Sequence, residues 1–76
     1  MPQGLFYYIN MVIIVNGKEE QPGRELTLAE YLETRQLAQG SVVVERNGQI
    51  IPKDRYRLVT LREGDVLEIV RLVGGG

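Results

Sequence analysis

The sequence predicts an α+β fold of ββαββ order, in which a mixed sheet carries one helix packed on one face. Two observations indicate the sheet. Met11 and four β-branched residues make up the segment 11–15, and Asn-Gly pairs suited to hairpin turns follow at residues 16–17 and 47–48. A third observation, a capping signal at Thr27, indicates the helix. With 76 residues we expect one small domain, which leaves little room for an internal active site.

The first hairpin is expected over residues 11–21. Residues 11–15 are continuously apolar and favour a central strand, whereas the polar residues 18–21 favour a return strand at an edge. The Asn16-Gly17 pair between them suits a type I′ turn, in which both residues have positive φ.

The helix is expected to begin after Thr27. Thr27 is a suitable N-cap, and Glu30 three residues later completes a capping box. Leu26 before the cap and Tyr31 within the helix have the spacing of a hydrophobic staple. We expect Gly40 to take the left-handed position just beyond the helix end.

A second hairpin and a last strand complete the predicted sheet. Residues 42–46 favour a strand, the Asn47-Gly48 pair turns the chain, and residues 49–51 form a short strand that a proline ends. Residues 53–63 are expected to be irregular, and residues 66–72 to form the final strand.

The first and last strands are the most apolar, so we expect them side by side and parallel in the sheet centre. This arrangement is a β-grasp, the ubiquitin-like fold, over residues 11–73. Residues 1–10 are predicted to be an N-terminal extension, or residues added to the natural protein, and to be dispensable. If ordered, they would add an edge strand or cover a sheet face. Residues 74–76 are predicted to be a flexible Gly tail.

The composition argues against several classes of function. The chain has no Cys and no His, and its formal net charge is −1. It therefore lacks a thiol nucleophile, thiolate zinc ligands and the commonest general base, so we expect a protein that is not an enzyme and binds no metal or cofactor. The balanced charge predicts no nucleic-acid partner. No segment is long and apolar enough to span a membrane, and we expect a cytoplasmic location.

The C-terminal glycines are the first candidate functional feature. Gly74, Gly75 and Gly76 have no side chains, so they are suited to enter a narrow channel in a partner protein. The Gly76 carboxylate would then be presented to the partner's active site. A frayed terminus is the alternative interpretation.

An apolar sheet face is the second candidate. Three predicted strands are apolar on both faces, although a single helix can cover only one face of the sheet. The uncovered apolar face indicates a docking surface. Val70 and Leu72 are expected to contact partners, with Val42 and Val44 beside them, and Arg71 is a further candidate because it lies close to the tail. Burial of the central strands is the alternative explanation.

Two segments of the sequence resemble the ThiS family, the sulfur-carrier proteins of thiamin biosynthesis. They are VVERNGQIIPKDRY, from Val43 to Tyr56, and LREGDVLEIVRLVGGG, from Leu61 to Gly76. The Val-Asn-Gly sequence of residues 15–17 also fits. The resemblance covers residues 11–76 and leaves residues 1–10 unmatched.

The resemblance implies a mechanism. A ThiF-like adenylating enzyme of the ubiquitin-activating type would use ATP and Mg²⁺ to convert the Gly76 carboxylate to an acyl-adenylate, with Gly74 and Gly75 in its channel. A sulfur donor such as a cysteine desulfurase system would then produce a thiocarboxylate. That group would donate sulfur to a ThiG-like thiazole synthase.

Three alternatives share the predicted fold. The small subunit of molybdopterin synthase (MoaD-like) would use the same thiocarboxylate for another acceptor. A ubiquitin-like modifier would be joined to lysines, and a non-catalytic interaction module would undergo neither reaction. Mass spectrometry separates them by the presence of a thiocarboxylate, of isopeptide bonds, or of neither.

Overall fold

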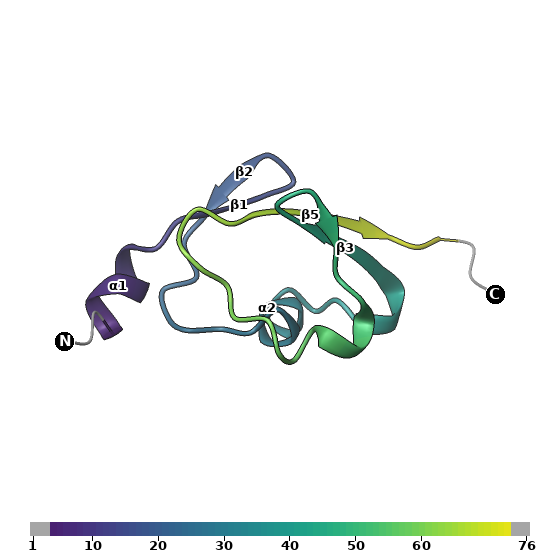
Figure 1. The fold of residues 1–76 in the computed structure, drawn as a ribbon, viewed down its shortest axis with the longest axis horizontal. Coiled ribbons are helices and arrows are strands. Elements are labelled where there is room, and N and C mark those ends of the chain that lie inside the picture. Colours follow the sequence, from purple (N-terminus) through teal and green to yellow (C-terminus); the bar gives the residue numbers. More distant parts are fainter. Residues whose placement is uncertain (1–3, 74–76) are drawn as a thin grey trace.

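The computed structural model describes residues 4–73, in which a five-stranded mixed sheet packs against one main helix (Figure 1). The strand order is β2-β1-β5-β3-β4. The strands are β1 (Ile13–Val15), β2 (Lys18–Glu20), β3 (Val42–Arg46), β4 (Gln49–Ile50) and β5 (Val66–Arg71). The predicted order ββαββ lacks one strand. Three strands follow α2 in the structure, namely β3 and β4 of the second hairpin and then β5.

The strand β5 occupies the centre of the sheet, as the sequence predicts. It pairs with β1 in parallel through Ile14–Val66 and Val15–Leu67. On its other side it pairs with β3 in antiparallel register from Val42–Arg71 to Arg46–Leu67. The polar β2 and the short β4 are the edges. The expected central parallel pair is confirmed.

Both Asn-Gly pairs form tight hairpin turns. Asn16 and Gly17 have φ values of 52° and 84°, and Asn47 and Gly48 have φ values of 52° and 87°. These positive values are those that a type I′ turn requires, and Asn and Gly tolerate them better than other residues. The predicted hairpins are therefore confirmed.

The main helix, α2 (Leu28–Thr34), begins at the predicted cap. The Thr27 hydroxyl accepts a hydrogen bond from the Glu30 N–H at 3.1 Å, and the Glu30 carboxylate accepts one from the Thr27 N–H at 2.9 Å. This reciprocal pair is a capping box. Leu26 and Tyr31, the expected staple pair, are both buried in the core.

The helix ends earlier than the sequence suggests, and the expectation for Gly40 is wrong. Gln36 takes the left-handed position, with φ 59°. Its N–H donates to the Glu33 carbonyl at 2.9 Å, and the Leu37 N–H donates to the Leu32 carbonyl at 2.9 Å. These two bonds form a Schellman motif. Leu37 packs against the core, which fixes the end of the helix at this point.

Two short 3₁₀ turns, η1 (Gln39–Ser41) and η2 (Lys53–Arg55), lie in the connections. Gly40 belongs to η1. The core lies between the sheet and α2. Among the residues whose burial the structure describes, its buried apolar residues are Met11, Ile13, Val15, Leu26, Leu28, Tyr31, Leu32, Val42, Val44, Tyr56, Leu61 and Leu67.

One carboxylate is buried at the start of β5. Asp65 is 5% exposed and accepts hydrogen bonds from the Arg46 guanidinium at 3.0 Å, the Asn47 amide at 3.1 Å and the Arg62 N–H at 2.8 Å. A buried carboxylate is tolerated only when it is paired and hydrogen-bonded in this way. Asp65 therefore anchors the entry to β5 to the end of β3.

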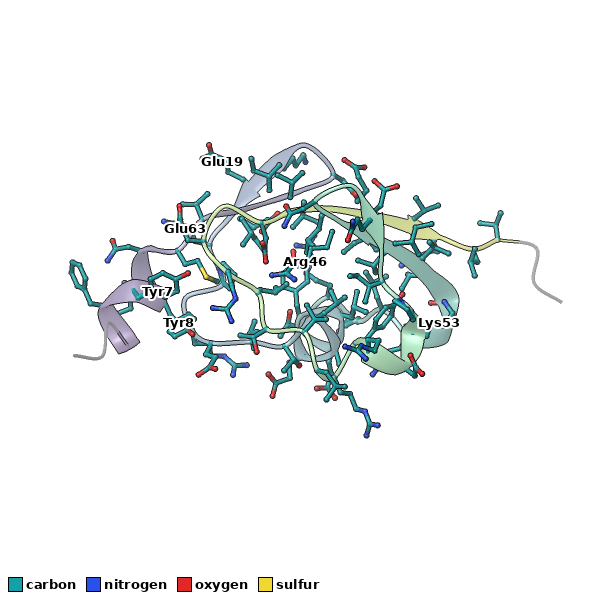
Figure 2. The ribbon with its side chains drawn as sticks, in the orientation of Figure 1. Tyr7, Tyr8, Glu19, Arg46, Lys53 and Glu63 are labelled. Atoms are coloured by element: carbon teal, nitrogen blue, oxygen red, sulfur yellow. The ribbon has the colours of Figure 1, made fainter. Side chains whose placement is uncertain are left out.

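The N-terminal segment forms a helix, α1 (Gly4–Asn10), so the expectation that it adds an edge strand or covers a sheet face is wrong. The Tyr7 hydroxyl accepts a hydrogen bond from the Glu63 N–H, and the Glu63 carboxylate accepts one from the Val12 N–H, both at 2.8 Å (Figure 2). Figure 1 shows α1 beside the loop that precedes β5 and far from the C-terminal end of that strand.

Removal of residues 1–10 is predicted to preserve the fold. Tyr7 and Tyr8 are half-buried against the core, and losing their contacts is expected to cost about 1–2 kcal/mol in the free energy of unfolding. Thermal and urea denaturation of a chain that starts at Met11 measures this difference. A loss of several kcal/mol would show that the segment belongs to the fold.

The substitution Gln36→Gly is expected to stabilise the protein by about 1 kcal/mol, because glycine adopts the left-handed conformation without a Cβ penalty. The matched control is Glu33→Gly, within the same helix, which is expected to destabilise by about 1 kcal/mol. Urea unfolding of both variants measures the difference. A destabilising Gln36→Gly would contradict the strain assigned to that position.

Candidate functional site

The sheet has one face against α2 and a second face, here called the outer face, on which no described element packs (Figure 1). Side chains alternate along a strand, so the buried residues Ile13, Val44 and Leu67 mark the face toward α2. The strand register then assigns the outer face to Ile14, Glu19, Val43, Glu45, Ile50, Val66, Glu68, Val70 and, just beyond β5, Leu72.

The predicted docking residues Val70 and Leu72 lie on this outer face. Their exposed fractions are 59% and 50%, and Val66 on the same strand is 40% exposed. Val43, half-buried, lies directly opposite Val70. Exposed apolar residues that share one face are a common feature of protein-binding surfaces.

Val42 and Val44 are not docking residues, and this part of the sequence prediction is wrong. Both are 0% exposed because they point toward α2 and fill the core. Val43, between them in the sequence, takes the place beside Val70. Alternation along residues 42–44 predicts that Val43 faces away from Val42 and Val44. Its pairing with Val70, however, depends on the register of two strands that are distant in the sequence.

Arg71 lies on the opposite face from Val70. It is paired with the buried Val42 in the sheet register, and it borders a cavity of about 250 Å³ that Tyr31 and Arg35 also line. Arg71 is exposed, so it remains accessible to a partner, but from the helix side of the sheet.

Two of the carboxylates on the outer face lie in the central strands and were not predicted from the sequence. Glu45 on β3 and Glu68 on β5 are directly opposite each other. They separate the Val43–Val70 pair from Val66 nearer the start of β5. Like charges in this cross-strand position are destabilising. The spacing Val66, Glu68, Val70 is the signal in the sequence that places these residues on one face.

The strand β5 leads directly toward the C-terminal glycines. Past Arg71, the Leu72 N–H donates to the Ser41 carbonyl at 2.8 Å. Val73 follows and is 85% exposed. The predicted tail residues Gly74, Gly75 and Gly76 lie outside the described residues.

The described residues offer little acid–base or metal chemistry. Burial raises the pKa of the Tyr31 and Tyr56 hydroxyls above their ordinary value of 10.0, which moves both groups further from neutral pH. Within residues 4–73 no group of three metal-ligating side chains is present. No helix in that range is long and apolar enough to cross a membrane.

Comparisons with known proteins agree on one family. The model of the ThiS family matches residues 7–76, so the match begins at Tyr7, four residues before Met11. The sulfur carrier protein ThiS of Bacillus subtilis (strain 168) is 44% identical over 63 residues, which are 82% of this chain and 96% of that protein.

A thiazole synthase of Paramagnetospirillum magneticum is 38% identical over 66 residues, which are 87% of this chain. The chain spans only 20% of the length of that enzyme. Among solved structures, the crystal structure of the thiamine biosynthesis protein ThiS from Geobacter metallireducens has a TM-score of 0.71 and 32% identity. That comparison covers 87% of this chain and all of the other, and it confirms the β-grasp class. The chain therefore belongs to the ThiS family.

Proposed function

We propose that this chain is the sulfur carrier for thiazole formation in thiamine biosynthesis. The observation that carries the proposal is the match to the Bacillus subtilis sulfur carrier protein along 96% of that protein's length. In the proposed reaction an adenylating enzyme uses ATP and Mg²⁺ to activate the Gly76 carboxylate. A sulfur donor, such as a cysteine desulfurase system, then replaces AMP by sulfur to give a thiocarboxylate.

Thiazole synthase is the proposed acceptor of the sulfur. A segment similar to this chain makes up one fifth of a thiazole synthase from Paramagnetospirillum magneticum, which supports a working contact between the two kinds of protein. The same arrangement is present in a thiazole synthase of Magnetococcus marinus, at 35% identity over 66 residues.

The structure supports a carrier that docks on one surface and reacts at its terminus. Val70 and Leu72 present apolar area within a few residues of the last described position, Val73. A partner that holds the outer face would be close to the point where the chain continues into Gly74, Gly75 and Gly76. In the proposed reaction the partners supply the acid–base chemistry. The chain would act in the cytoplasm, together with the ATP-dependent partner.

Adding one residue after Gly76 is predicted to abolish adenylation. The terminal carboxylate would move by about 3.5 Å, and displacements of about 1 Å already reduce reaction rates strongly. ATP–pyrophosphate exchange with the cognate adenylating enzyme measures this step, with intact mass as the check that the extra residue is still attached. Normal exchange by the intact extended chain would contradict the sulfur-carrier function.

A charge at Val70 is predicted to weaken binding to the adenylating enzyme and to thiazole synthase at least about tenfold, with the fold preserved. The substitution is Val70→Glu, at a side chain that is 59% exposed. The matched control is Leu58→Glu, at an apolar side chain 69% exposed and away from the outer face, which is expected to bind normally.

A companion substitution places the same charge on the side of β5 that faces α2. Ile69 is half-buried against the core, so Ile69→Glu is expected to destabilise the domain because a charged group would replace apolar contacts. Calorimetric titration measures binding, and circular dichroism measures folding. Normal binding by Val70→Glu, or a stable Ile69→Glu, would show that the assignment of the two faces is wrong.

A further inference from the structure

The side chain of Asn16 makes two hydrogen bonds to the backbone of the last strand. Its Oδ1 accepts from the Ile69 N–H at 2.7 Å, and its Nδ2 donates to the Ile69 carbonyl at 3.2 Å. The backbone N–H of Asn16 donates to the Leu67 carbonyl at 2.9 Å. One residue therefore bonds two successive positions along the same edge of β5.

This side-chain pair replaces strand pairing that the fold does not provide. The backbone of β1 pairs with β5 only as far as Leu67, because the chain turns away at Asn16-Gly17. The strand β5 continues to Arg71. Beyond Ile69, its β1 side borders a cavity of about 250 Å³ that Asn16, Ile69 and Arg71 line.

The other edge of β5 is bonded further along. Its pairing with β3 reaches Arg71, and the Leu72 N–H donates to the Ser41 carbonyl at 2.8 Å. Without the Asn16 amide, the second half of β5 would be held on the β3 side alone. A strand that is bonded along one edge only bends more easily out of the sheet. A bend of about 10° at Ile69, carried over the four residues to Val73, moves the chain by about 2 Å.

We propose that Asn16 is a positioning residue for activation of the Gly76 carboxylate. Its side-chain amide holds the second half of β5, and so fixes the direction in which that half, with Val70 and Leu72, leaves the sheet relative to Val43 and Val66 of the outer face. The inference rests on the proposed sulfur-carrier function. A displacement of about 1 Å at the reacting group is enough to reduce the rate of a positioned reaction by about a hundredfold.

The second Asn-Gly turn provides a matched control. The Asn47 Oδ1 accepts from the Val66 N–H at 2.9 Å, and the Asn47 N–H donates to the Val66 carbonyl at 2.8 Å. Asn47 thus holds the first residue of β5 through the same kind of turn. Its bonds lie three residues further from the C-terminal end of the strand than those of Asn16.

The test compares Asn16→Gly with Asn47→Gly. Glycine keeps the positive φ that both turns need and removes only the side-chain amide. Hydrogen exchange in Asn16→Gly is expected to accelerate more than about tenfold at the Ile69 N–H and to remain unchanged at the Val70 N–H, which faces β3. In Asn47→Gly the acceleration is expected at the Val66 N–H instead.

The functional readout is ATP–pyrophosphate exchange with the cognate adenylating enzyme. Asn16→Gly is expected to lower kcat at least about tenfold with KM within about twofold, because the apolar side chains of the outer face are unchanged. Asn47→Gly is expected to keep both constants within about twofold. A second variant, Asn16→Asp, keeps the acceptor for the Ile69 N–H but sets a carboxylate oxygen against the Ile69 carbonyl, so its kcat is also expected to fall.

Two results would overturn the positioning role. One is an unchanged kcat in Asn16→Gly although exchange at Ile69 is faster. The other is an equal loss of kcat in both glycine variants in proportion to their melting temperatures, which would indicate general destabilisation. If the wild-type chain supports no pyrophosphate exchange, the proposed function fails and the inference fails with it. The wild-type measurement distinguishes this result from the other two.

Discussion

The structure depends on β5 being held along both of its edges. This strand contributes Leu67 to the core and, among the strands of residues 4–73, is the one that pairs with both halves of the chain, β1 from the first hairpin and β3 from the second. Asp65 fastens its start through three hydrogen bonds. The strand that organises the core is also the one that precedes the C-terminal glycines in the sequence.

Much of this architecture could be predicted because its signals are local. An Asn-Gly pair between two β-type segments specifies a type I′ turn, and a Thr with a Glu three residues later specifies a helix start. The central position of β5 followed from its apolar composition. The helix end was missed because Gln36, a residue with no special tendency toward positive φ, occupies the position where glycine is expected. The packing of Leu37 decided that position, and packing is not a local property.

The candidate site was predicted only in part for the same reason. Alternation within one strand separates Val70 from Ile69, and that separation is confirmed. Which valine of β3 stands beside Val70 depends on the register between strands more than twenty residues apart, and a shift of one residue exchanges the two faces. The buried Val42 and Val44 were therefore exchanged with Val43. The Tyr7–Glu63 contact of α1 joins residues still further apart and has no local signal in the sequence.

The outer face carries a cost that the fold itself does not explain. Glu45 and Glu68 face each other in the central strands, where opposite charges or β-branched residues would pair better. Exposed apolar residues beside them also add nothing to the core. Surfaces that sacrifice stability in this way are typical of binding sites. The α1 helix contacts the loop before β5, at the other end of the strand from Val70 and Leu72, so changes there act on the start of β5. The contacts of α1 near the start of β5 are thus separate from the contacts of Asn16 near the end of that strand.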